Sequence, residues 1–229
     1  MISMFQVQRR APGSSAWRVL FWWSTVVALL RWYFVVFYRY RRHGMEHVPK
    51  TGAVLLVSNH QSNLDPPLVG FIAIDRPFKS IARESLFSSS ILGYLMRTFG
   101  AISIRRGESD TKAIRAAIAE LHAGGSVMIF PEGTRSVDGR IGTFQRGLWL
   151  LIRRSDAMIL PVGIEGAFDV WPIGSKLKRR GWIEAQAGKP ISCEELIGLG
   201  EDAGMELVKS RIEELRLQCR ARIDMRSMK

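Results

Sequence analysis

Short apolar runs alternate with amphipathic stretches along most of the chain. The run at residues 53–57 is apolar and includes β-branched side chains, which is typical of a buried strand. Asp65-Pro66-Pro67 follows and indicates the start of a helix, because aspartate caps helices and proline fits the first turn. Strands that alternate with helices predict an α/β fold, in which helices cover the faces of a sheet. The pattern predicts further strands at 77–82, 100–104, 126–130, 158–164 and 182–187, and helices at 66–74, 91–96, 110–123, 144–153 and 201–223.

A dense apolar segment at residues 16–38 precedes this pattern, and the basic run Arg39-Tyr40-Arg41-Arg42 follows it. The segment is long enough to span a bilayer, which takes about 20 apolar residues. However, Arg31 lies inside it, and its many Trp and Tyr side chains prefer the membrane interface. We therefore expect a helix or helix pair in one leaflet; a single span and a helix in the protein's own core are the alternatives. Residues 1–50 are predicted to form a membrane-associated helical segment with a basic linker, and residues 51–229 a globular domain.

The charge balance of the chain indicates an anionic partner. The chain contains 33 Lys and Arg against 21 Asp and Glu, a formal net charge of +12. A phospholipid surface, a nucleic acid or a phosphorylated substrate would each fit this charge. No nucleic-acid motif is present, so we expect no nucleic-acid partner. The basic run Lys176-Leu177-Lys178-Arg179-Arg180 could bind lipid headgroups or the phosphates of CoA, and a solvated loop is the alternative. Cys193 and Cys219 have neither the spacing of metal ligands nor that of a disulfide framework, and we predict no metal site.

A polar cluster, Ser58-Asn59-His60-Gln61-Ser62, follows the first predicted strand. His60 would lie in a strand-to-helix loop, where sites form in open α/β sheets, and Asp65 would open the next helix. The two side chains could then meet. The carboxylate would accept the imidazole Nδ1–H, which leaves Nε2 free to remove a proton from a substrate hydroxyl. A loop histidine that satisfies local backbone groups is the alternative.

Arginines follow two more of the predicted strands. Arg105 and Arg106 come after the strand at 100–104, and Arg135 comes after the strand at 126–130, in a turn where Gly133 permits close backbone approach. The planar guanidinium group suits bidentate phosphate recognition, and N–H groups in a glycine turn add donors. We therefore interpret these arginines as candidate phosphate ligands.

Four sequence blocks occur in a fixed order: Asn59–Asp65, Gly100–Arg106, the run Phe130-Pro131-Glu132-Gly133-Thr134-Arg135-Ser136, and Leu160–Ile164. Together they resemble the blocks of the glycerolipid acyltransferases, the 1-acylglycerol-3-phosphate acyltransferase family. The resemblance covers about residues 50 to 190. It implies a mixed sheet flanked by helices, an acyltransferase domain at residues 51–229, and a membrane-associated N-terminal helical segment.

The resemblance also implies roles for individual residues. His60 corresponds to the general base and Asp65 to the carboxylate that orients it, while Arg106 would bind the acceptor phosphate. The third block would contribute to acceptor binding and site architecture through Glu132, Gly133, Thr134 and Arg135, and Pro161 matches a block linked to the acyl donor. Arg105 and Ser103 depart from the family pattern, in which an aspartate and an aromatic or apolar residue, respectively, are common. This departure leaves the exact acceptor open.

The implied reaction is transfer of a fatty acyl chain from acyl-CoA or acyl-carrier protein to the free hydroxyl of a lysophospholipid such as 1-acyl-sn-glycerol-3-phosphate. This gives phosphatidic acid without a metal or tightly bound cofactor. The partners would be the lysophospholipid acceptor, the acyl donor and an anionic membrane surface, and the expected location is the cytoplasmic face of the cell membrane. Alternatives are the same chemistry on another lyso-lipid, and a non-catalytic basic membrane-binding protein.

Overall fold

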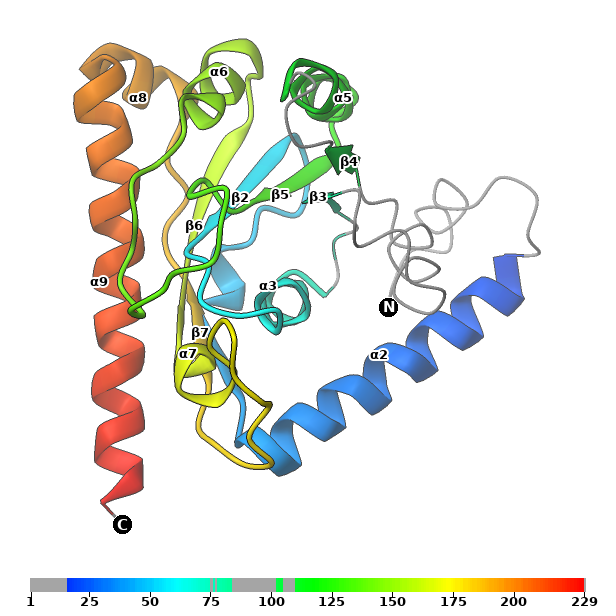
Figure 1. Ribbon diagram of the computed structural model, residues 1–229. Helices are drawn as coiled ribbons and strands as arrows, with labels where there is room; N and C mark the ends of the chain where they lie inside the picture. Colours follow the sequence, from blue (N-terminus) through cyan, green and yellow to red (C-terminus); the bar gives the residue numbers. More distant parts are fainter. Residues whose placement is uncertain (1–15, 75, 77, 84–101, 105–109, 229) are drawn as a thin grey trace.

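A mixed seven-stranded sheet with helices on both faces forms the described part of the protein (Figure 1). The computed structural model describes residues 16–74, 76, 78–83, 102–104 and 110–228. The strand order is β1-β7-β6-β2-β5-β3-β4. The five strands from β6 to β4 are parallel, whereas β7 is antiparallel to β6 and β1 is parallel to β7. The bounds are β1 Arg41–His43, β2 Val54–Ser58, β3 Lys79–Arg83, β4 Ile102–Ile104, β5 Ser126–Ile129, β6 Met158–Glu165 and β7 Glu184–Ala187.

Two hydrophobic layers sandwich the sheet. Leu55 and Leu56 are both fully buried although successive strand residues point to opposite faces, so helices cover β2 on both sides. The core around Leu56 includes residues of α3, α7 and the end of α2, whereas the core around Leu55 includes residues of α5, α6, α8 and α9. The helices are α2 Ala16–Tyr38, α3 Asp65–Ile72, α5 Asp110–His122, α6 Arg146–Arg154, α7 Ala167–Val170, α8 Cys193–Leu199 and α9 Glu201–Ser227, with a 3-10 turn at Met45–His47.

Within the described residues, three elements of the structure differ from those predicted from the sequence. Strand β1 lies in the predicted basic linker, and α7 and α8 were not predicted. Strand β1 has no apolar run because it is the edge strand beside β7, where basic side chains reach solvent or meet Glu184. The expected helix at 91–96 lies outside the described residues. The other predicted strands and helices are confirmed with small changes in their bounds.

Helix α2 is a single continuous helix, and in its last two turns apolar side chains occur both on the face that packs on the domain and on the exposed face. Phe34 and Tyr38 are buried against the domain, and partly buried residues of α2 pack beside them. On the opposite face, Trp32 and Val36 are 61% and 49% exposed. The helix extends outward from the sheet in Figure 1. Among the described residues, no helix combines the length and the hydrophobicity that a bilayer span requires.

Helix α9 packs along β6 and β7. Ion pairs reinforce this packing. Glu165 at the end of β6 is 1% exposed and bonds Arg216 and Arg220 of α9. Glu184 of β7 is fully buried and is paired in the same way with Arg222 and Arg226. A buried carboxylate without such partners would cost several kcal/mol, so these arginines explain why acidic residues are tolerated in the two strands.

Gly163 permits the close contact between β6 and α9. A Cβ at this position would lie 2.6 Å from the backbone N of Arg216 and 2.8 Å from the backbone C of Leu215. We expect Gly163→Ala to lower the free energy of unfolding by about 1–3 kcal/mol, because either the helix or the strand must shift. Urea unfolding measures this change. Gly198→Ala is the matched control, since Gly198 lies in α8 with nothing within 4 Å of an added Cβ; equal loss in both variants would contradict the assignment.

Candidate active site

The loops that follow β2 and β5 carry most of the predicted site residues that the structure describes. Strand β2 lies between β5 and β6 and is parallel to both, so the carboxyl ends of the three strands share one edge of the sheet. The loop after β2 leads to α3 on one face, and the loop after β5 leads to α6 on the other. When the loops after two neighbouring strands lead to helices on opposite faces of the sheet, a crevice forms between the loops. Open α/β sheets bind their ligands in such a crevice.

His60 and Asp65 meet at this edge. The imidazole Nδ1 lies 2.8 Å from Asp65 Oδ2, and the Asp65 side chain is fully buried at the start of α3. The same oxygen accepts the backbone N–H groups of Gln61 at 2.6 Å and Ser62 at 2.7 Å. The carboxylate is therefore fixed by its own loop before it meets the histidine. A carboxylate at Nδ1 favours the tautomer with Nε2 unprotonated, which is the form a general base requires.

Phe130 holds one face of the His60 ring. The two ring centroids are 4.2 Å apart and the planes differ by 18°, so the rings stack. Phe130 follows β5 directly, and β5 is the neighbour of the strand that leads to His60. The stacking limits rotation of the imidazole, whose side chain keeps 18% of its surface exposed. Sequence reasoning assigned no role to Phe130, although adjacent parallel strands would have brought the two residues to one edge.

Side-chain bonds to the rest of the fold fix the loop after β2. Asn59 continues the strand pairing through its amide group: its Nδ2 donates to the Ile164 carbonyl at 2.9 Å, and its Oδ1 accepts the Ile164 N–H at 2.8 Å. Ser62 Oγ donates to the Trp171 carbonyl at 2.9 Å, beyond α7. The loop is thus held between β6 and the segment after α7, so His60 has a defined position before any substrate binds.

Glu132 connects the two loops. Its Oε1 accepts the backbone N–H of His60 at 2.8 Å, and its Oε2 accepts the N–H of Gly142 at 2.8 Å. The residue is 6% exposed. Burial raises the pKa of Glu132, and the N–H groups of Gly142 and His60 oppose that rise. Both carboxylate oxygens are bonded to backbone, so the geometry favours support of the His60 loop over contact with an acceptor.

Three of the remaining predicted site residues lie in the turn after β5, and one lies outside the residues that the structure describes. Gly133 has φ +67°, a conformation that favours glycine, in the turn directly after β5. Thr134 is exposed and Arg135 half-buried in the same turn. Arg106 lies outside the described residues. Within the described ranges, no three His, Cys, Asp or Glu side chains come together as metal ligands would.

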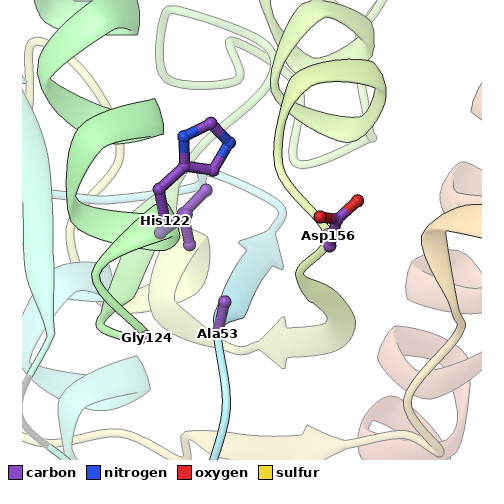
Figure 2. Close-up of a pocket in the computed structure, with 5 residues that line it drawn as sticks. Ala53, His122, Gly124 and Asp156 are labelled. Atoms are coloured by element: carbon purple, nitrogen blue, oxygen red, sulfur yellow. The ribbon is translucent and has the colours of Figure 1, made fainter.

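A surface pocket lies at the other edge of the sheet (Figure 2). Ala53, Gly124 and Asp156 come shortly before β2, β5 and β6, so this pocket is at the amino ends of the strands. Its histidine, His122, places Nε2 2.6 Å from the Arg154 carbonyl oxygen and is thereby engaged with the backbone. The pocket holds none of the predicted site residues, so His60 and its neighbours remain the candidate active site.

Comparisons with known proteins identify the family of the chain. A family model described as acyltransferase matches residues 39–165, which is more than half of the chain and includes β2, β5, β6 and the site residues described above. The chain belongs to the acyltransferase family. The region that matches the acyltransferase family model begins just before β1 and ends with the last residue of β6.

Individual relatives share the family and the fold. A 1-acyl-sn-glycerol-3-phosphate acyltransferase of Pseudomonas aeruginosa is 30% identical over 83% of this chain and 70% of its own length. A chloroplastic one of Arabidopsis thaliana is 29% identical over 76% of this chain. The chain spans about half the length of the plant relatives it matches, 49% of the Arabidopsis protein. The crystal structure of the acyltransferase PlsC from Thermotoga maritima superposes with a TM-score of 0.64 at 24% identity, covering 76% of this chain and 69% of that one, and shows the same fold.

Proposed function

We propose that this acyltransferase moves a fatty acyl chain from a thioester donor, acyl-CoA or acyl-carrier protein, to the free hydroxyl of 1-acyl-sn-glycerol-3-phosphate. The product is phosphatidic acid. The observation that carries this proposal is the contact of 2.8 Å between His60 Nδ1 and Asp65 Oδ2 at the carboxyl edge of the sheet. A histidine base oriented in this way activates a hydroxyl, and the hydroxyl of a lyso-lipid is the nucleophile that the family's chemistry uses.

The proposed mechanism takes one nucleophilic attack and one collapse. His60 Nε2 removes the proton of the acceptor hydroxyl as its oxygen attacks the thioester carbonyl. The C–O bond forms, and the C–S bond of the tetrahedral intermediate then breaks. The thiolate leaves and takes the proton that the imidazolium holds, so the enzyme returns to its starting state. Asp65 stabilises the imidazolium between the two steps without itself becoming protonated.

Arginines at the strand ends would hold the acceptor phosphate. Arg135 is half-buried in the turn after β5, the strand beside β2, and Arg106 is proposed to act with it. Gly133 lets the backbone of this turn approach a ligand, and Thr134 adds an exposed hydroxyl. A phosphate held here would place the acceptor beside His60, since the two loops share one sheet edge.

The exposed face of α2 supports a location at a membrane surface, and we propose the cytoplasmic face of the cell membrane. Its apolar stripe contains Leu29, Trp32 and Val36, three and four residues apart, which places them on one side of the helix. Side chains of this kind are stabilised in the headgroup region of a bilayer. Residues 1–50 would thus form the membrane-associated segment, and residues 51–229 the acyltransferase domain, with β1 of the sheet contributed by the former.

Replacing Arg135 by glutamine is expected to raise the KM for 1-acyl-sn-glycerol-3-phosphate about tenfold or more, because a hydrogen-bonded charge on the phosphate is lost. The KM for the acyl donor should stay within about twofold. Steady-state kinetics with each substrate varied in turn measure this split. Arg140→Gln is the matched control, since Arg140 is exposed in the same loop; an unchanged acceptor KM in Arg135→Gln would contradict the role.

The whole proposal is tested with the full chain in mixed micelles. Labelled long-chain acyl-CoA and acyl-carrier protein are each offered with 1-acyl-sn-glycerol-3-phosphate, with other lysophospholipids and with an amino-acid-containing lyso-lipid. Phosphatidic acid formation supports the proposed reaction. Transfer only to another lyso-lipid would change the acceptor, and absence of transfer to every acceptor from either donor would contradict the enzymatic proposal.

A further inference from the structure

The loop between α7 and β7 carries a concentrated positive charge. Residues 173–180, here called the basic loop, lie on the surface, and no acidic residue occurs from Trp171 to Ile183. In the described part of the chain, the four cations of this loop make no ion pair with a carboxylate, whereas the arginines along α9 pair with Glu165 and Glu184. These four exposed side chains are Lys176, Lys178, Arg179 and Arg180.

Apolar side chains are exposed among these cations. Ile173 is 41% exposed, and Leu177, which lies between two lysines, is 39% exposed. The backbone of the loop is nevertheless held in place: Trp171 Nε1 donates to the Ser175 carbonyl at 3.1 Å, and Lys178 N donates to the Val170 carbonyl at 3.0 Å. A fixed loop that exposes leucine and isoleucine together with lysines and arginines combines the two side-chain types that lipid interfaces attract.

The basic loop lies beside the end of α2 and at the same sheet edge as His60. The Tyr38 hydroxyl donates to the Lys178 carbonyl at 3.0 Å, and Gly181 N donates to the Phe37 carbonyl at 3.2 Å. Ser62 Oγ, in the loop of His60, bonds the Trp171 carbonyl just before the basic loop begins. Figure 1 shows the loop, in yellow, next to the end of α2 where that helix meets the domain.

We propose that the basic loop binds the anionic headgroups of a lipid bilayer, as a second membrane contact in addition to the apolar face of α2. The inference rests on the proposed function and deepens it, because it names the lipid class that the surface around the site requires. Lysine and arginine side chains near an anionic bilayer each add to binding, and the exposed Ile173 and Leu177 enter the headgroup region beside them. With both contacts formed, the edge of the sheet that carries His60 faces the lipid phase in which the acceptor is dissolved.

The test measures binding of the full chain to lipid vesicles by flotation, without any substrate. Vesicles contain phosphatidylcholine alone, or phosphatidylcholine with about one third phosphatidylglycerol. We expect K176Q/K178Q/R179Q/R180Q to bind the anionic vesicles at least about tenfold more weakly than the wild type, and to bind the neutral vesicles equally. Circular dichroism and thermal unfolding establish that the variant is folded.

A matched variant controls for the loss of four positive charges. K112Q/R115Q/R153Q/R154Q removes the same charge from exposed positions on α5 and α6, at the opposite end of the domain in Figure 1. It should bind anionic vesicles within about threefold of the wild type. Equal weakening in both variants, or wild-type binding by the loop variant, would overturn the proposal. In a separate transfer assay in mixed micelles, a loss in the loop variant confined to acyl transfer from acyl-carrier protein would also overturn it, since the loop would then bind that acidic protein. Failure of the wild type to transfer acyl groups would count against the proposed function. The vesicle experiment would still test lipid binding by the basic loop, because it uses no substrate.

Discussion

Replacing His60 by alanine is expected to lower kcat of acyl transfer by about 10²–10⁴-fold, the range that a general base contributes. The reason is that no other described side chain accepts the hydroxyl proton from the position of the imidazole, which Asp65 and Phe130 fix from two sides. Radiolabelled acyl-CoA and 1-acyl-sn-glycerol-3-phosphate in mixed micelles give the rate. Vesicle binding should be unchanged, which separates an enzyme from a basic membrane-binding protein without catalysis.

His122→Ala is the control for this experiment. His122 lies at the end of α5 near the amino ends of the strands, and its Nε2 lies 2.6 Å from the Arg154 carbonyl oxygen. The rate of acyl transfer by His122→Ala should stay within about twofold of the wild-type rate, because His122 is remote from the reacting groups. Equal rates for the wild type and His60→Ala would refute the assignment of the base, whatever lipid is the acceptor.

Glu132→Gln is expected to lower kcat about 10–100-fold while KM for both substrates changes by less than about threefold. The carboxylate accepts two backbone N–H groups, from His60 and Gly142, and an amide has only one oxygen to offer. One N–H would then face an NH₂ group in a buried place, and the His60 loop would move. A fall in kcat without a rise in KM is the result that a positioning residue gives.

Two observations distinguish this result from its alternatives. If Glu132 bound the acceptor directly, the acceptor KM would rise and kcat would change little. If it served stability alone, Glu132→Gln would lower the unfolding temperature but leave kcat intact at a temperature where the variant is folded. Glu132→Asp keeps two acceptor oxygens on a shorter side chain, and should recover part of the lost kcat.

The site could be predicted from sequence where its parts are close along the chain. His60 and Asp65 are five residues apart, and an apolar strand followed by a proline-rich helix start fixes how the segment between them turns. Their contact is therefore a local consequence of secondary structure. The same holds for the strands β2, β5 and β6, whose buried apolar runs leave little choice of conformation.

The rest depends on contacts between segments that no local pattern reveals. Strand β1 reads as a basic linker, since its place in the sheet is decided by the partner β7 and by Glu184. Glu132 belongs to a recognisable block, but only the folded structure brings its oxygens to the backbone of His60, 72 residues away in sequence. Sequence alone therefore predicts that Glu132 matters and not which group it holds.

The pairing of Asn59 with Ile164 has a consequence for the order in which the protein is made. The two residues are 105 apart, so the ribosome has synthesised β6 before the histidine loop can be held at its final position. Strand β1 can pair only after β7, which follows β6 in the chain, has been synthesised. Non-local pairing of this kind folds slowly, whereas a helix such as α2 forms within microseconds. A nascent chain thus forms the apolar helix α2 long before the loop that carries His60 is ordered.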